Sequence, residues 1–448
     1  MALRRFEPAR ALVISFALVI LIGTVLLRQP WAARPGRQLD WTEALFTATS
    51  AVCVTGLTVR PPGDHSVAGQ VIIVSLIQVG GLGIMTFGLF FSLLLGRKLS
   101  LFGREVILSS LSHTPWEDFW PLLRTLMLAT AVVEGTGALL LSVAWWSQKG
   151  MLAIPWGVFH AVSAFCNAGF GLDARSLMPW VSNVLVNVTV GLLIMLGGIG
   201  FLPVTELVRR LRSGRRRPLS LHTRTVLAMT GSLLVVGWLG FGILEWGTTL
   251  ASHTLPTRFL AIWFQGITPR TAGFSTLDFN AMTPATLLFV MMLMFIGASP
   301  GSTGGGIKTT TVGVLVAVLI ARVRSRRQTT SFRRGVGASS VATAVVVLLL
   351  SAAVVIAGII LVCAIEHGHA GGGAARAPFL AEAFDVVSAF GTVGLSTGIT
   401  ARLSHHSWVV MVLVMFAGRV GPLTLGLALA GRGPRPEPRY AEEDLMVG

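Results

Sequence analysis

The 448-residue sequence is poor in charged residues, which make up 12% of it, and it has only three cysteines and one tyrosine. Soluble globular domains carry about 25% charged residues, so the composition excludes a water-soluble enzyme of this length. Three cysteines are too few for a disulfide framework or a structural zinc site. In a soluble chain, a net charge of +16 would suggest binding to nucleic acid. In a membrane protein, the interpretation depends on where the charges lie along the chain.

Hydrophobic residues make up 53% of the chain and gather in runs long enough to cross about 30 Å of hydrocarbon. We expect eight such spans, at residues 11–27, 68–95, 120–146, 181–208, 225–250, 284–321, 339–365 and 407–430. Shorter apolar stretches of about a dozen residues lie within successive pairs of spans, at 41–54, 152–166, 257–268 and 378–390. They are too short to cross, so we expect them to be re-entrant. The first run lacks a cleavage site behind it and predicts an uncleaved membrane helix.

The positive charges are unevenly placed between the two sides that these spans define. Of the 35 lysines and arginines, 23 fall at the amino end, in the loops after the second, fourth and sixth spans and in the tail. The opposite side holds ten, and Lys308 and Arg419 lie within spans. By the positive-inside rule, both termini are cytoplasmic and the short segments enter from outside. Topology explains the basic loops better than nucleic-acid binding does.

Each short segment ends in a glycine that can be aligned with the others, at Gly56, Gly169, Gly273 and Gly394. An aromatic residue stands ten positions before each glycine, and Ser-Ala stands six and five positions before it in three repeats; the third has Ile267-Thr268. The spacing predicts an all-α polytopic membrane protein with four helix–pore-helix–helix repeats arranged pseudo-fourfold around one central ion pore. The expected repeats are 1–95, 96–211, 212–327 and 328–431, followed by a cytoplasmic tail at 432–448.

Extended backbone after a half-crossing helix leaves carbonyl groups unpaired, which is tolerated where they line a watery or ion-filled cavity. Rings of such carbonyls can replace the water shell of a monovalent cation, and glycine allows the required backbone without a Cβ clash. Oxygen ligands suit an alkali ion rather than a transition metal. We therefore interpret Cys53 and Cys166 as small packing residues rather than metal ligands.

The four glycine segments resemble the selectivity filters of the Trk/Ktr/HKT potassium transporters, and the chain is most similar to the KtrB-type subunit. The predicted filter residues are Cys53, Val54, Thr55, Gly56, Cys166, Asn167, Ala168, Gly169, Arg270, Thr271, Ala272, Gly273, Gly391, Thr392, Val393 and Gly394. The resemblance implies inward translocation of K⁺ through backbone carbonyls, often coupled to or stimulated by Na⁺. In that family a serine at the first filter glycine goes with sodium permeability, and this chain keeps Gly56. The resemblance also implies a homodimer in the cell (inner) membrane and a cytoplasmic nucleotide-binding regulatory ring.

The sixth span contains several helix breakers between Gly297 and Lys308 and cannot remain a regular helix. This stretch resembles the family's intramembrane gating loop. The predicted gate residues are Gly301, Ser302, Thr303, Gly304, Gly305, Gly306, Lys308 and Arg419. The stretch misses the phosphate-binding loop G-x-x-x-x-G-K-[ST] by one residue. Arg419 replaces a glycine of two other repeats. The resemblance favours a positive charge that raises a barrier to cations below the filter, and pairing with buried carbonyls is the alternative.

The other polar residues leave two roles open. Glu43, Glu382 and Asp385 stand near the starts of pore helices and either cap them or attract cations to the mouth. Glu134 and Glu245 lie within spans and are expected to face other helices. No catalytic constellation stands out, so we expect no enzyme. Two alternatives to a gated pore remain, namely a sodium- or proton-coupled secondary cation symporter with alternating access and a membrane scaffold that transports nothing.

Overall fold

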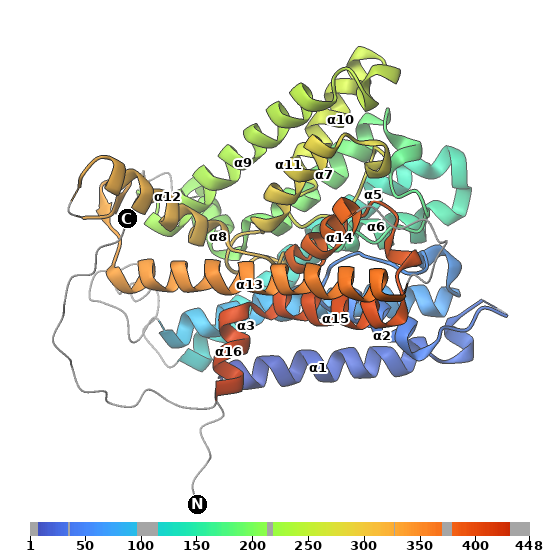
Figure 1. Cartoon of the computed structure of the whole chain (residues 1–448), viewed down its shortest axis with the longest axis horizontal. Coiled ribbons are helices and arrows are strands. Elements are labelled where there is room, and N and C mark those ends of the chain that lie inside the picture. Colours follow the sequence, from blue (N-terminus) through green and yellow to red (C-terminus); the bar gives the residue numbers. More distant parts are fainter. Residues whose placement is uncertain are drawn as a thin grey trace, which may run out of the picture.

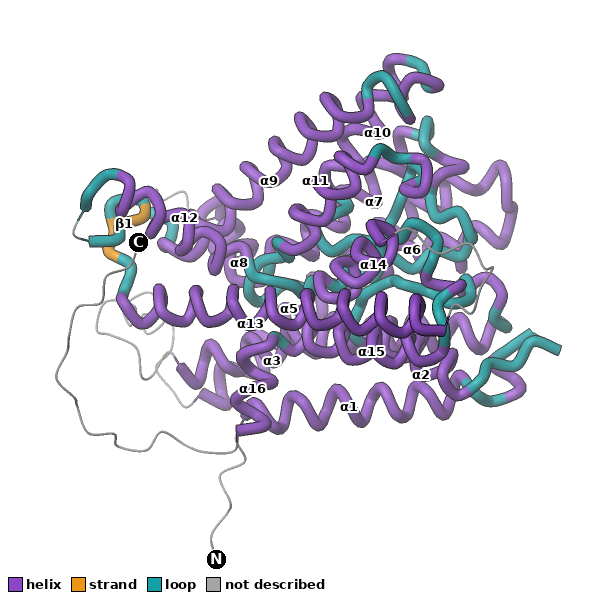
Figure 2. The backbone as a smooth tube through the Cα atoms, in the orientation of Figure 1, coloured by secondary structure: helices purple, strands orange, loops and turns teal. Residues whose placement is uncertain are grey.

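The computed structural model describes residues 8–34, 36–95, 115–212, 218–326, 328–369 and 379–430. Within these ranges the regular structure is helical apart from one hairpin, in which β1 (Thr330–Ser331) pairs antiparallel with β2 (Arg334–Gly335) (Figure 2). The expected all-α fold is therefore confirmed. The expected tail at 432–448 lies outside the described residues, as do the basic residues of 96–114 and 213–217.

Each repeat consists of a long helix, a short pore helix and a third helical segment, as the spacing predicts. The long first helices are α1 (Pro8–Leu27), α5 (Pro115–Lys149), α9 (Leu221–Glu245) and α13 (Ala338–His369). The pore helices are α2 (Trp41–Val52), α6 (Ala153–Phe165), α10 (Leu255–Ile267) and α14 (Phe379–Gly391). The third segments are α3 (Val67–Leu95), α7 (Val184–Ile199) with α8 (Phe201–Arg212), α11 (Pro284–Phe295) with α12 (Thr309–Val323), and α15 (His405–Val420) with α16 (Pro422–Ala430).

The four repeats close into a ring. Each third segment packs against the pore helix of the next repeat: α3 on α6, α7 on α10, α11 on α14, and α15 of the last repeat on α2 of the first. In Figure 1 the pore helices lie toward the right, whereas α8, α12, α16 and the hairpin lie toward the left, at the same end as the start of α1. The pseudo-fourfold arrangement is therefore confirmed.

The third segments begin alike because each starts after a short polar residue that can accept a hydrogen bond from the first turn. Ser66 accepts from the amide of Gly69 at 3.1 Å, Asn183 from Val186 at 3.1 Å, Thr283 from Thr286 at 3.3 Å and Ser404 from Ser407 at 3.3 Å. An N-cap of this kind is worth about 1 kcal/mol. Three of these caps stand ten residues after an aligned glycine, so the distance from pore segment to third helix is encoded locally.

Two of the third segments are broken where the sequence predicts a continuous span. α7 and α8 meet at 100°, at Gly200 with a φ of +92°, and α15 and α16 meet at Gly421 with a φ of +91°. The single helices expected over 181–208 and 407–430 are therefore wrong, because a left-handed residue cannot continue an α-helix. The amide of Phe201, freed by the first break, donates to the carbonyl of Gly301 at 3.1 Å. Gly83, at the same place in the first repeat, stays within α3.

Within the described residues, five helices are long and apolar enough to cross a membrane, or six if the bent pair α7–α8 counts as one span. Three shorter apolar helices, α11, α12 and α15, belong to the broken third segments. The outward faces of α1 and α13 are apolar, with Leu18 and Leu349 more than half exposed. A membrane protein needs such faces because lipid replaces water around it.

Candidate functional site

Each pore helix runs into a non-helical stretch that ends at an aligned glycine. We call these stretches the glycine segments, residues 53–56, 166–169, 270–273 and 391–394, and Gly391 is also the last residue of α14. In every segment the glycine and the residue two positions before it have a left-handed φ. The glycines are Gly56 (+93°), Gly169 (+69°), Gly273 (+75°) and Gly394 (+91°), and their partners are Val54 (+57°), Asn167 (+59°), Thr271 (+65°) and Thr392 (+49°).

A left-handed φ is rare for any side chain and most unfavourable for β-branched residues such as Val54, Thr271 and Thr392. Strain of this kind persists where the surroundings enforce it, commonly at functional sites. A φ that alternates in sign along the chain turns successive carbonyl groups toward the same side of the backbone. Each glycine segment therefore has the backbone form that a row of inward-facing oxygens requires.

The glycine segments surround one axis in the order of the repeats. A Cβ added to Gly56 would overlap the carbonyl oxygen of Ala168 in the second segment. In the same way, a Cβ added to Gly169 would lie 2.8 Å from the Cα of Gly273. A Cβ added to Gly273 would overlap the carbonyl of Val393, and a Cβ added to Gly394 would overlap the carbonyl of Thr55. The contacts run from first segment to second, third, fourth and back to first. Glycine is required at this level because backbone from a neighbouring repeat fills the place of a side chain.

All sixteen predicted filter residues lie in the glycine segments, and all except the partly exposed Gly394 are buried. Arg270 can contribute only its backbone, because its guanidinium group turns away to the hydroxyl of Thr230 on α9 at 3.3 Å. The thiols of Cys53 and Cys166 are buried and free. Within the described residues, no three histidine, cysteine or acidic side chains are placed to hold a metal ion.

Hydroxyl groups of the pore helices hold the ends of the glycine segments. The amide of Gly56 donates to the hydroxyl of Ser50 at 3.1 Å, and the amide of Gly394 donates to that of Ser388 at 3.0 Å. In the third repeat the hydroxyl of Thr268 instead donates to the carbonyl of Phe274. The sequence analysis did not assign these residues a role, although the serine six positions before the glycine is visible as part of the repeat.

Beyond the glycines lies a cavity of about 310 Å³, which we call the mouth cavity. The four aligned glycines line its floor, and Asp173 and Asp278 contribute carboxylates to its wall. Arg175 also lines it, 3.8 Å from the carboxylate of Asp173. Two aspartates against one arginine leave the wall with a net negative charge, which favours the approach of a cation.

The acidic residues at the pore helices hold structure rather than face the mouth cavity. Asp385 is buried and accepts from the hydroxyl of Ser396 at 2.8 Å, the amide of Thr397 at 3.2 Å and the hydroxyl of Thr400 at 2.5 Å. These bonds fix the backbone that follows Gly394.

Glu43 and Glu382 are also buried. Glu43 accepts from the amide of Asp40 at 3.0 Å and forms an ion pair with Arg60 at 3.0 Å. Glu382 lies 3.6 Å from the ring of His367. Of the two roles that the sequence left open, the structure supports capping for Glu43, through its bond to the amide of Asp40. Asp385 instead bonds to the chain after Gly394, and neither carboxylate oxygen of Glu382 has a hydrogen-bond partner among the described residues.

On the other side of the glycine segments, the 297–308 loop between α11 and α12 packs beside them. The hydroxyl of Thr303 donates to the carbonyl of Phe165 at 3.1 Å, directly before the second segment. The amide of Gly305 donates to the hydroxyl of Thr392 in the fourth segment at 3.1 Å. Ser302 and Thr303 are almost fully buried. The loop therefore lies against the base of the glycine segments, hydrogen-bonded to the fourth segment and to the last residue of α6, which precedes the second segment.

Two basic side chains, Lys308 and Arg419, bind backbone carbonyls of this loop. The ammonium of Lys308 donates to the carbonyl of Gly304 at 2.6 Å, within the loop itself. Arg419, only 2% exposed, donates from one nitrogen to the carbonyl of Thr303 and from another to the carbonyl of Gly80 on α3 at 2.6 Å. Its Nε has no partner among the described residues. The guanidinium group thus ties the loop to a helix of the first repeat, as the sequence's carbonyl-pairing alternative expects.

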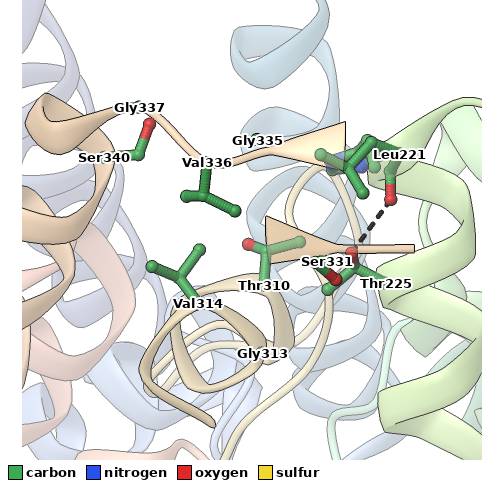
Figure 3. Close-up of a pocket in the computed structure, with 11 residues that line it drawn as sticks. Leu221, Thr225, Thr310, Gly313, Val314, Ser331, Gly335, Val336, Gly337 and Ser340 are labelled. Atoms are coloured by element: carbon green, nitrogen blue, oxygen red, sulfur yellow. Dashed lines mark hydrogen bonds between the residues drawn. The ribbon is translucent and has the colours of Figure 1, made fainter. Parts of the chain in front are cut away.

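A second cavity of about 290 Å³ lies apart from the glycine segments, between α9, α12, the hairpin and the start of α13 (Figure 3). Small residues and hydroxyl side chains line much of it, among them Thr225, Ser331 and Ser340. Thr225 uses its hydroxyl within its own helix, donating to the carbonyl of Leu221 at 2.9 Å. No residue of the glycine segments or of the 297–308 loop lines this cavity.

Comparison with known proteins agrees with this architecture. A family model named TrkH, described as a cation transport protein, matches residues 11–436. The chain is 38% identical to the Ktr system potassium uptake protein B of Bacillus subtilis, over 99% of this chain and 97% of that protein. It is 35% identical to the potassium/sodium uptake protein NtpJ of Enterococcus hirae, over 99% and 98%. The crystal structure of the potassium transporter TrkH from Vibrio parahaemolyticus has the same fold, with a TM-score of 0.69 at 19% identity over 95% of this chain and 86% of that one.

These matches cover nearly the whole chain, including all four glycine segments and the 297–308 loop. The family is one of membrane ion transporters rather than enzymes, which agrees with the expectation from the sequence. The chain belongs to the TrkH family of cation transport proteins.

Proposed function

We propose that this protein translocates potassium ions inward across the cell membrane through a filter formed by the four glycine segments. The observation that carries the proposal is the closed ring in which each aligned glycine contacts the backbone of the next repeat. Carbonyl oxygens of such a ring can replace the hydration shell of K⁺. Two relatives with more than a third of their residues identical to this chain are named potassium uptake proteins.

The pore helices support a cation rather than an anion. All four end within a few residues of the start of a glycine segment, so their C-terminal ends, which carry partial negative charge, point toward the axis. Asp173 and Asp278 add full negative charge at the mouth cavity. Sodium is the second ion to test, because one relative is named a potassium/sodium uptake protein.

We propose that the 297–308 loop is the gate. It is held closed by bonds to Phe165 at the end of α6 and to Thr392 in the fourth glycine segment, and by the bridge through Arg419. Its backbone amides also donate to the carbonyls of Gly197, Gly198 and Gly418 on the neighbouring helices. Opening requires these bonds to break, and its glycines give the loop backbone freedom. Of the predicted gate residues, Thr303, Gly304, Gly305, Lys308 and Arg419 take part in the closing contacts, whereas Ser302 bonds to the carbonyl of Ser299 within the loop.

The surroundings in the cell follow from the same reasoning. The inner membrane with both termini cytoplasmic is the orientation that the positive-inside rule favours. The last turn of α8 holds Arg209 and Arg212, which offer a basic docking surface for a cytoplasmic nucleotide-binding ring. A homodimer completes the proposal, since apolar faces such as that of α13 can pack against a second copy as well as against lipid.

The test is rubidium uptake by vesicles that contain the purified chain. Gly273→Ser should change the ratio of sodium to rubidium uptake, because Gly273 lies in the ring. Gly36→Ser is the matched control: Gly36 also has a left-handed φ, of +74°, but lies in an exposed loop with no atom within 4 Å of a built Cβ. Equal ratios for both variants would contradict a path through the ring. Uptake that stops when sodium and proton gradients are collapsed would favour the symporter.

A further inference from the structure

A buried carboxyl group lies behind the second glycine segment. Glu134 on α5 is 9% exposed and forms no ion pair within the described residues. Its Oε2 accepts a hydrogen bond from the side-chain amide of Gln78 on α3 at 3.0 Å. An ionisable residue inside a membrane span costs free energy, so its presence usually indicates a function. The proposed path of ions does not contact Glu134.

The partners of Glu134 lead directly to the glycine segment. The sulfur of Cys166, the first residue of that segment, lies 3.5 Å from the side-chain oxygen of Gln78 and 3.9 Å from Oε1 of Glu134, and its single S–H can donate to either oxygen. Cys166 is fully buried. A Cβ added to Gly81 on α3 would lie 2.7 Å from the same sulfur atom, so the helix leaves the thiol no room to withdraw. Glu134, Gln78 and Cys166 thus form one hydrogen-bonded cluster across two repeats and the segment.

The cluster has no counterpart in the other repeats. Cys53 holds the same position in the first segment, but its thiol forms no hydrogen bond within the described residues. The third repeat has Arg270 there, whose side chain bonds to Thr230, and the fourth has Gly391. Among the described residues, contact of a buried acid with the first residue of a glycine segment is therefore particular to the second segment, whereas Asp385 bonds to the chain that follows the fourth.

We propose that Glu134 is a positioning residue for the second glycine segment and thereby helps to set the selectivity for potassium over sodium. It fixes Cys166, with Gln78 as the bridge between them. Because Gly56 contacts Ala168 and Gly169 contacts Gly273, a shift of the second segment reaches both of its neighbours. Discrimination depends on how well the protein holds the ligand oxygens in place. This inference rests on the proposed function of the ring.

The experiment measures sodium and rubidium uptake by vesicles containing the full chain. Glu134→Leu removes both carboxylate oxygens at similar volume, and with them the acceptor that holds the side-chain amide of Gln78. Cys166→Ala removes the donor in the segment. Each should raise the ratio of sodium to rubidium uptake by about fivefold, the change that one net hydrogen bond supports. Glu134→Gln keeps an acceptor oxygen and should restore the native ratio. Thr130→Val is the matched control, because Thr130 is buried one turn away on α5 and its hydroxyl has no partner among the described residues.

A native ratio in folded Glu134→Leu protein would overturn the proposal, and so would an equal shift in Thr130→Val. A larger shift in Cys53→Ala than in Cys166→Ala would also overturn it, since the acid serves only the second segment. If Glu134→Leu fails to fold, as judged by size-exclusion chromatography, Cys166→Ala decides, because it removes a single sulfur atom. If vesicles with the native protein take up no rubidium, the proposed function of the ring is overturned instead.

Discussion

Arg419 holds the 297–308 loop against α3, and its replacement should open the proposed gate. Arg419→Ala removes the bonds to the carbonyls of Thr303 and Gly80. A hydrogen bond from a charged donor contributes about 1.5–3 kcal/mol, so the closed arrangement loses at least about 3 kcal/mol. A difference of that size moves a two-state equilibrium by roughly 150-fold. Rubidium uptake by vesicles should rise at least about tenfold, since a closed loop then opens for a large share of the time.

Arg419→Lys separates the bond from the charge. Lysine keeps the positive charge but offers a single nitrogen, which cannot bridge Thr303 and Gly80 as two guanidinium nitrogens do. If the bridge closes the loop, uptake in Arg419→Lys should lie between those of the native protein and Arg419→Ala. If the charge alone blocks cations, Arg419→Lys should match the native protein.

Three results would refute the proposal that the bridge through Arg419 holds the loop closed. Native uptake in Arg419→Ala would show that the bonds do not hold the loop closed. Native uptake in Arg419→Lys, together with high uptake in Arg419→Ala, would mean that the positive charge, and not the bridge to two carbonyls, limits uptake. Lower uptake in Arg419→Ala, in protein with the native melting temperature, would mean that Arg419 supports the conducting form.

Three further changes test separate contacts. Ser50→Ala should lower the selectivity for rubidium over sodium, because it removes the acceptor of the Gly56 amide. Ser163→Ala is its control, since the hydroxyl of Ser163 has no partner among the described residues. An equal loss of selectivity in both variants would contradict a role for the bond between Ser50 and Gly56. Thr303→Val should raise uptake about fivefold, because the bond to Phe165 is worth about 1 kcal/mol; unchanged uptake would remove this bond from the gate. Thr283→Ala should destabilise the chain by about 1 kcal/mol through the lost N-cap, measured as a lower melting temperature in detergent at native selectivity.

The sequence predicts the ring better than it predicts the breaks. Glycines and aromatics at fixed spacing are local features, and so are the N-caps of α3, α7, α11 and α15, so the elements of each repeat follow from short stretches of chain. The break at Gly200 does not, because Gly83 at the matching place remains helical. What differs is the neighbour: at Gly200 the carbonyls of Pro300 and Gly301 from the loop lie against the glycine, and Phe201 gains a partner there.

The hydrogen-bond partners of the closing residues are also beyond local sequence. Arg419 reaches Gly80, 339 positions away, and Thr303 reaches Phe165, 138 positions away. No periodicity contains such pairs, since they depend on how the repeats meet. The sequence does mark that Arg419 is unusual, as a charge where two repeats have glycine, but it leaves open whether that charge repels ions or binds carbonyls. Only the positions of the two carbonyls favour binding.

The repeats differ from one another at the places where the molecule is proposed to act. The features that all four share, namely the pore helix, the alternating φ and the capped third segment, build a ring that would be nearly symmetric on its own. Symmetry alone provides no means of closing the ring or of tuning one segment. The loop at 297–308 is present in one repeat only, Arg419 replaces a glycine in one repeat only, and Glu134 supports one segment only. A departure from the repeat, rather than agreement with it, is therefore the better guide in this chain to residues that control passage.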